Sequence, residues 1–170
     1  MGSVLELILI VVGIISVIVW IVGGYPNQDP LWFTSGFDER PASIIIYHYG
    51  ETREVFPSSS GYEDLVAALN ASIPQHAGYV ESLHPRGDSL DSYTLRGFAL
   101  ELRYTSPVVV HTRYYFPKAV RLFVAIDGSY NYVKTPILFR GGAEKWLPNG
   151  IALKDVSGLT TIVEQVLASQ

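Results

Sequence analysis

The strongest pattern in the chain is an apolar run over residues 4–22, in which every residue except Glu6, Gly13, Ser16 and Trp20 is Val, Leu or Ile. As a helix with a rise of about 1.5 Å per residue, the run is about 28 Å long, close to the hydrocarbon thickness of a bilayer. The four exceptions fall within an arc of about 80° around the helix, and the opposite side is entirely aliphatic. We therefore predict a transmembrane helix with a helix–helix contact face at these four residues. Alternatively, Glu6 and Trp20 are interfacial anchors, and the two small residues are incidental.

Residues 1–24 are predicted to be an uncleaved signal anchor rather than a cleaved signal peptide. The run lacks a basic n-region and an A-x-A-like cleavage site, and it is longer than a typical h-region. The orientation rests on few charges, because the first basic residue after the run is Arg40. We favour an N-terminus inside the cell. This orientation predicts a single-pass protein of the cell membrane with an extracytoplasmic domain, either periplasmic or extracellular.

Residues 25–43 are punctuated by Gly and Pro and are predicted to form a juxtamembrane linker. Tyr25, Trp32 and Phe33 lie in this segment. Amphipathic aromatic side chains collect at the level of the lipid headgroups, so we expect these three residues at the membrane–water interface. The linker is then expected to lie along the membrane surface.

The remaining residues, 44–170, are predicted to form an extramembrane α+β domain. Apolar and alternating segments predict strands at 44–49, 52–56, 94–104, 108–116, 119–127 and 131–140. Helical spacing predicts helices at 61–72 and 156–167, with Ser60 and Glu63 as a capping box and Asp155 as an N-cap. Residues 74–92 are expected to form a long loop with a short strand near 79–83. Short connections favour an antiparallel sheet of five or six strands with the two helices packed on one face.

The composition and the absence of known motifs exclude several classes of function. The formal charge is −4 and no basic block is present, so nucleic acid is not expected as a partner. The absence of cysteine excludes disulfides, thiolate metal sites and a cysteine nucleophile. The sequence has no Walker A loop, no G-x-G-x-x-G and no G-x-S-x-G context for a serine nucleophile. We therefore predict no catalytic residues and no cofactor.

A few residues remain candidates for chemistry. His48 and His111 fall on predicted strands and are weak candidates for a metal site, although hydrogen-bonded strand histidines are the simpler interpretation. Residues 86–88 spell Arg-Gly-Asp, which is an adhesion tripeptide on exposed loops but also ordinary turn chemistry. The later strands contain regularly spaced Arg and Tyr, which predict either a protein-binding sheet face or a solvated one. These are Arg96, Arg103, Arg113, Arg121, Lys134 and Arg140, with Tyr104, Tyr114, Tyr115, Tyr130 and Tyr132.

These patterns favour a non-catalytic accessory or scaffolding subunit of a larger bacterial membrane complex. The expected partners are the lipid bilayer and other integral membrane subunits, and an energy-transducing electron-transfer complex is one candidate host. A membrane-tethered ligand-binding module, with a pocket between the sheet and the 74–92 loop, is the alternative. A metal-dependent enzyme using His48 and His111 is a third, less favoured hypothesis.

Overall fold

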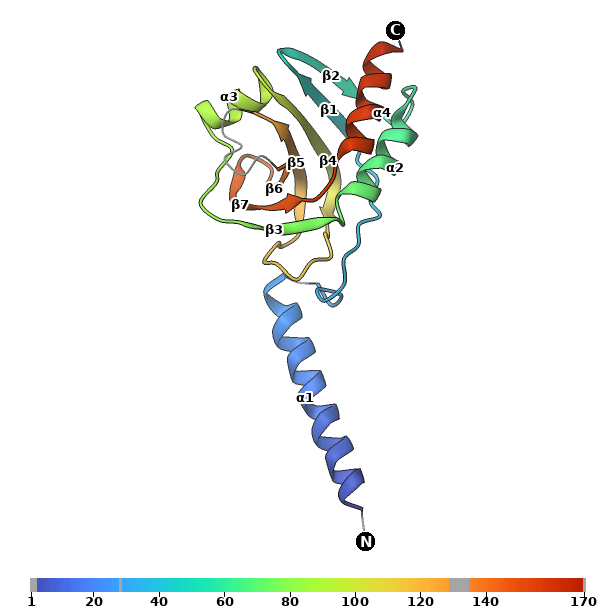
Figure 1. The fold of residues 1–170 in the computed structure, drawn as a ribbon, viewed down its shortest axis with the longest axis vertical. Coiled ribbons are helices and arrows are strands. Elements are labelled where there is room, and N and C mark those ends of the chain that lie inside the picture. The colour runs from blue at the N-terminus through green and yellow to red at the C-terminus, as the bar shows by residue number, and fades with distance from the viewer. Residues whose placement is uncertain (1–2, 28, 129–134, 170) are drawn as a thin grey trace.

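The computed structural model describes residues 3–27, 29–128 and 135–169. Helix α1 (Val4–Asn27) extends away from the rest of the molecule (Figure 1). The candidate span Val4–Tyr25 has a mean hydropathy of 3.0, and no residue of its most apolar window is buried. By length and composition, this helix is therefore able to cross a membrane.

A capping box begins α1, and the sequence analysis did not identify it. The backbone N–H of Glu6 donates to Ser3 Oγ (3.3 Å), and the backbone N–H of Ser3 donates to Glu6 Oε2 (3.1 Å). These bonds give partners to two backbone donors at the start of the helix, where no preceding turn supplies carbonyls. Glu6 therefore has a local role at the helix start, whether or not it also contacts a partner helix.

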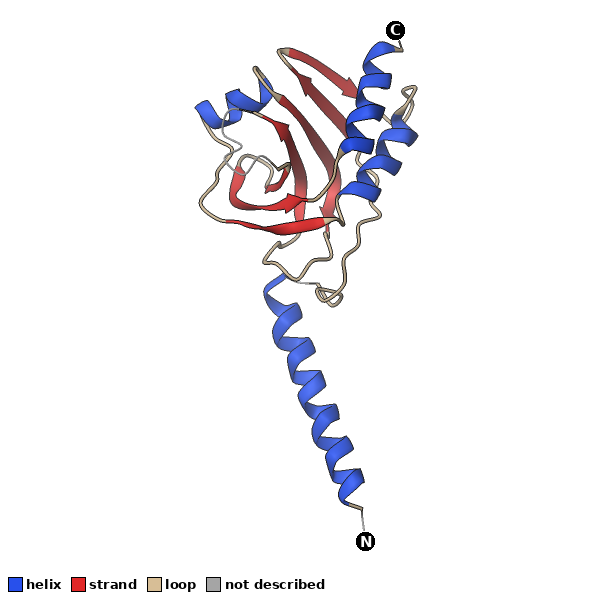
Figure 2. Ribbon diagram, viewed as in Figure 1, coloured by secondary structure: helices blue, strands red, loops and turns tan. Residues whose placement is uncertain are grey.

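Seven strands in the described residues form one antiparallel sheet in the order β2-β1-β4-β5-β6-β7-β3. The strands are β1 (Ser43–His48), β2 (Glu51–Val55), β3 (His76–Val80), β4 (Phe98–Val108), β5 (Ala119–Asp127), β6 (Ile137–Gly141) and β7 (Trp146–Leu153). Strands β1 and β2, and the run from β4 to β7, pair with their neighbours along the chain, whereas β1 also pairs with β4 and β3 pairs with β7. The sheet is strongly curved, and the helices lie on both of its sides (Figure 2).

Helices α2 (Tyr62–Ser72) and α4 (Ser157–Ala168) pack against each other and on the same face of the sheet. Alternation along the strands places Ile44, Leu100 and Leu122 on this face, where they form the larger apolar core with the two helices. The short helix α3 (Asp88–Thr94) lies on the opposite face. Its Tyr93 packs there in a smaller cluster that includes Phe123 on β5.

The predicted α+β class is confirmed, with its antiparallel sheet and two helices on one face, and the sheet has seven strands rather than five or six. The predicted strand 108–116 is wrong, because β4 ends at Val108 and β5 begins at Ala119, directly opposite it. Residues 109–118 connect these two strands. Val110 and Phe116 are buried in the core, which explains why the connection is as apolar as a strand.

Other corrections concern the segments around the strands. The expected long loop 74–92 contains β3 and most of α3, and β7 was not predicted. The predicted strand 131–140 begins in residues that lie outside those described. Ser60 is not the N-cap of α2; that position is Gly61, with a φ of 79° and no side-chain capping bond. A Cβ at Gly61 would lie 2.5 Å from Val166, so glycine permits both the turn and the close approach of α4.

Candidate functional site

The first candidate site is the junction between α1 and the domain, where the chain folds back along the end of the helix. Trp20 Nε1 donates a hydrogen bond to the carbonyl of Pro30 (2.7 Å). Trp32 packs so closely on Gly23 that a Cβ at that position would overlap its indole ring. The backbone N–H of Asp29 also donates to the Gly24 carbonyl (3.2 Å). Residues 29–32 are therefore held against the last turns of α1.

Asp29 connects this junction to the domain. Its side chain is 1% exposed, and Oδ1 lies 2.9 Å from His111 Nδ1 while accepting a hydrogen bond from the backbone N–H of Leu31 (2.8 Å). His111 and Gly36 exchange two backbone hydrogen bonds, of 3.0 and 3.3 Å. A buried carboxylate requires such partners, because desolvation of an unpaired charge is costly. The residues after α1 are thus bound to the connection between β4 and β5.

The predicted interfacial aromatic residues surround this junction. Tyr25 and Phe33 are exposed, and Trp32 is half-buried against α1 and meets the Phe33 ring edge-on at 6.1 Å. Leu31 beside them is also exposed. This collection of exposed apolar and aromatic side chains at the end of an apolar helix suits the headgroup level of a membrane. Their position at a membrane surface stays a prediction.

The four residues of the predicted contact face of α1 have different surroundings within this chain. Ser16 Oγ donates to the Val12 carbonyl of its own helix (2.8 Å), and Trp20 is bonded to Pro30. Glu6 belongs to the capping box described above. At Gly13, a Cβ would meet no atom within 4 Å. Whether this face binds another helix stays a prediction.

The structure separates the two metal candidates. His48 ends β1 and pairs with Phe98, the first residue of β4, whereas His111 lies beyond Val108, the last residue of β4. An eleven-residue strand spans more than 30 Å at about 3.3 Å per residue, so the two imidazoles do not share an ion. His48 instead packs edge-on against the rings of Tyr49 and Phe98. Within the described residues, no three His, Cys, Asp or Glu side chains are placed to hold a metal.

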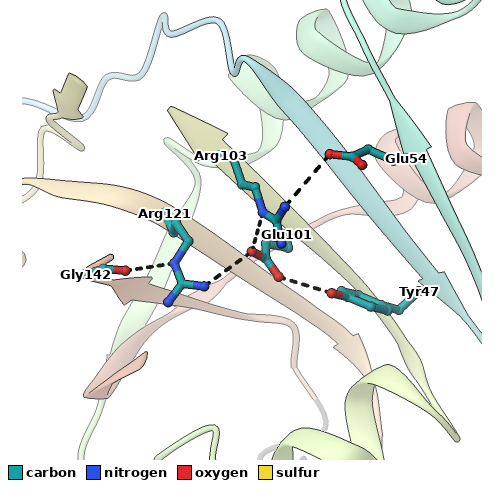
Figure 3. A network of polar contacts seen from close by, with 6 residues as sticks. All are labelled: Tyr47, Glu54, Glu101, Arg103, Arg121 and Gly142. Carbon is teal, nitrogen blue, oxygen red and sulfur yellow. Dashed lines mark hydrogen bonds and ion pairs between the residues drawn. The ribbon is translucent and has the colours of Figure 1, made fainter. Parts of the chain in front are cut away.

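A second candidate site lies on the sheet face opposite α2 and α4, around Glu101 of β4 (Figure 3). Glu101 is 5% exposed. Its Oε1 accepts from Arg103 Nε (2.8 Å) and lies 3.5 Å from Arg121 Nη1, while its Oε2 accepts from Tyr47 (3.1 Å). Burial, and then the Glu101 charge, raise the pKa of Tyr47 to about 12. Tyr47 is therefore a neutral donor at physiological pH rather than a base.

The cations of this network have further contacts. Arg121 Nε donates to the Gly142 carbonyl (2.8 Å), and its guanidinium lies 4.6 Å from the centre of the Trp146 ring. Arg103 is half-exposed and reaches toward Glu54 (3.9 Å). The carboxylates of Glu101 and Glu54 balance the two guanidinium groups, and the half-exposed Arg103 and Glu54 present opposite charges to solvent. The buried carboxylate thus holds Arg103 and Arg121 in fixed positions on the sheet face. This arrangement suits a binding surface better than acid–base catalysis.

The predicted Arg and Tyr face is assembled only in part. Arg103 and Arg121 are direct neighbours on it, but Tyr104 is buried on the helix-covered face. The guanidinium of Arg140 lies over Tyr115 and Phe116 in the connection between β4 and β5. Tyr130, Tyr132 and Lys134 lie outside the described residues.

The Arg-Gly-Asp tripeptide leads directly into α3. Gly87, with a φ of 49°, is the N-cap, and Asp88 is the first residue of the helix. The Ser89 hydroxyl accepts from the Arg86 backbone N–H (3.0 Å) and contacts the His84 carbonyl (2.6 Å). The tripeptide thus has a structural role as the turn that begins a helix.

Sequence reasoning missed the roles of Asp29 and Glu101. Asp29 stands in a Pro-containing linker and has no sequence feature that marks it as buried. Glu101 alternates with Leu100 and Leu102, which correctly predicts its side of the strand. Its partners Tyr47 and Arg121 come from the neighbouring strands β1 and β5, which no local pattern shows.

Comparisons with known proteins supply a fold but no family. No protein-family model matches the chain, and the curated proteins contain no match. Among solved structures, the crystal structure of YycH from Bacillus subtilis is similar, with a TM-score of 0.50 and 11% sequence identity. The likeness covers 81% of this chain, and the chain spans only 40% of the length of the YycH chain. At this identity, the likeness shows a shared α+β fold.

Proposed function

We propose that this chain is a single-pass membrane protein whose α+β domain is a non-catalytic accessory or scaffolding subunit of a larger membrane complex. The observation that supports this most is the fixed junction after α1. The Asp29–His111 contact and the Trp20–Pro30 hydrogen bond hold the domain at a set position relative to the helix. A fixed link allows the helix and the domain to contact the same partner complex at the same time. A domain that acts alone on a flexible tether has no need of a fixed link.

The partners in this proposal are the bilayer and other integral membrane subunits. A partner helix approaches α1 along the side of Gly13, where the absence of a side chain permits close backbone contact. The domain is placed on the extracytoplasmic side, and Arg103 and its network offer a charged surface there. An energy-transducing electron-transfer complex is one class of host. In that case the isolated subunit purifies without haem or metal, and stoichiometric haem or metal on it contradicts this assignment.

The test is to tag the C-terminus, solubilise native membranes in mild detergent, and analyse the purified material by native gel and mass spectrometry. We expect integral membrane subunits in stoichiometric amounts. Gly13→Leu should reduce their recovery, whereas Ile18→Leu, on the opposite side of α1, should not. A lone monomer or homo-oligomer across several detergents contradicts the accessory role.

The alternative function is a membrane-tethered ligand-binding module. An open cavity of about 300 Å³ at His76, the first residue of β3, favours it. Thermal-shift measurements on the full chain in detergent test this function, because a ligand of the module should raise the unfolding temperature. The absence of any stabilising small molecule, together with a stable partner complex, rejects it.

A further inference from the structure

The cavity beside His76 lies where three segments meet. Residues 33–35 follow the junction, Arg113 and Tyr114 belong to the connection between β4 and β5, and Lys154 follows β7. Figure 1 shows β3 and this connection at the end of the sheet nearest to α1. The cavity is therefore on the side of the domain that faces the apolar helix.

Two positive charges line this cavity, from the exposed side chains of Arg113 and Lys154. Within the described residues, no carboxylate oxygen lies within 4 Å of the charged nitrogens of Arg113 or Lys154. The Arg113 guanidinium lies 5.2 Å from the centre of the Tyr114 ring, and its Nη2 donates to the Tyr114 hydroxyl (3.2 Å). This contact uses one of its five N–H groups and orients the others. Two cations facing one open cavity attract an anion to it.

His76 also lines this cavity. Its Nε2 is buried and has no hydrogen-bond partner, and its ring meets Tyr114 edge-on at 6.3 Å. Burial lowers the pKa of His76, and the charges of Arg113 and Lys154 lower it further, while a hydrogen bond with the Ile73 backbone opposes them. The lowered pKa favours the uncharged imidazole. His76 therefore forms part of the cavity wall, and Arg113 and Lys154 supply the charge of the cavity.

We propose that this cavity binds a phosphate group through Arg113 and Lys154. Arginine binds two phosphate oxygens with its planar fork, and lysine supplies a compact charge to a third. The volume of about 300 Å³ accommodates a phosphate with few additional atoms and is small for a nucleotide. The Ser35 side chain lines the same cavity and supplies a hydroxyl.

The phosphate group has two possible sources with the same chemistry. One is free inorganic phosphate, and the other is the phosphodiester of an anionic lipid headgroup. The exposed Phe33 at the rim suits a position at the membrane surface. The lipid source rests on the membrane anchoring proposed above, whereas the free-phosphate source does not.

The experiment titrates inorganic phosphate, by calorimetry, into the full chain in nanodiscs of phosphatidylcholine and, in parallel, in detergent. Arg113→Gln and Lys154→Gln should each weaken binding about tenfold, the loss expected for one charge-assisted contact. Arg96→Gln and Lys118→Gln remove the same charges from exposed positions outside the cavity, and they should leave the affinity within about twofold. Acetate, a model for a peptide carboxylate, should bind more weakly than phosphate.

A second arm uses nanodiscs that also contain phosphatidylglycerol and counts the retained lipids by native mass spectrometry. Phosphate binding that depends on Arg113 and Lys154 supports the site with free phosphate as its source. Phosphatidylglycerol retention with the same dependence, in the absence of phosphate binding, supports the lipid source. Three outcomes overturn the site. These are the absence of both phosphate and phosphatidylglycerol binding, an equal loss of binding in the two control variants, and binding of acetate as tight as that of phosphate. Failure of the chain to insert into nanodiscs refutes the membrane anchoring instead, and the titration in detergent then decides the phosphate site.

Discussion

Glu101→Gln tests whether the buried carboxylate organises the open face of the sheet. The substitution preserves the shape of the side chain but removes the charge that Arg103 and Arg121 contact at 2.8 and 3.5 Å. A hydrogen bond to a charged group stabilises a protein by about 1 kcal/mol more than a neutral one. The carboxylate accepts two such hydrogen bonds, from Arg103 and Tyr47, which predicts a loss of about 2 kcal/mol. For a folded unit of about 125 residues, this loss lowers the unfolding temperature by about 8 °C.

The matched control is Glu54→Gln on β2. Glu54 also faces Arg103, at 3.9 Å, but both side chains are substantially exposed, at 38% and 46%. An exposed pair of this kind contributes less than about 0.5 kcal/mol because water and salt screen it. We therefore expect an unfolding temperature within about 2 °C of the unmodified chain.

The assay is thermal unfolding of the full chain in mild detergent, followed by near-ultraviolet circular dichroism. Trp146 lies against Arg121, so its signal should also change in Glu101→Gln before any unfolding. Equal unfolding temperatures for the Glu101 and Glu54 variants would refute the view that burial makes the Glu101 contacts strong.

Three further predictions follow from local packing and charge. Gly23→Ala should displace Trp32 from α1 and increase protease cleavage within residues 29–36, whereas Gly13→Ala, with open space around it, should not. Gly97→Ala places a Cβ 2.7 Å from the Ser92 carbonyl oxygen and should cost about 3 kcal/mol in urea unfolding. Gly158→Ala, in the open first turn of α4, should instead stabilise by about 0.5 kcal/mol, and equal effects of the two changes would contradict the packing. In phosphate-free buffer, stability should fall as the pH drops below 6.5, the ordinary pKa of histidine, because the lowered pKa of His76 makes the unfolded chain bind more protons. His76→Gln should reduce this dependence, and an unchanged pH profile would show that His76 is not its source.

Much of the fold follows from local patterns along the chain. The apolar run of α1, the alternation in β4 and β5, and the helical spacing in α2 and α4 each identify an element without knowledge of its neighbours. These segments have a period, because one side of each element is buried and the other is not. The same patterns gave the α+β class and the placement of two helices on one face.

A segment that is buried on both sides, or on neither, shows no regular alternation of apolar and polar residues. The connection 109–118 buries Val110 and Phe116 without forming a ladder, so its composition was mistaken for a strand. In β7, Trp146 and the run 150–153 are buried while the residues between them are more exposed, and the prediction missed the strand. Helix α3 is only seven residues long, which is too short for a helical period to show.

The sequence by itself determined that the chain has an apolar helix long enough for a membrane, a two-layer α+β unit and no cysteine chemistry. Only the tertiary structure decided which polar residues meet: Asp29 with His111, Glu101 with two arginines, and His76 with Arg113 and Lys154. The physical reason is the separation along the chain of the residues that interact. Periodicity and capping depend on residues a few positions apart, whereas these contacts join residues tens of positions apart whose approach depends on strand order and register.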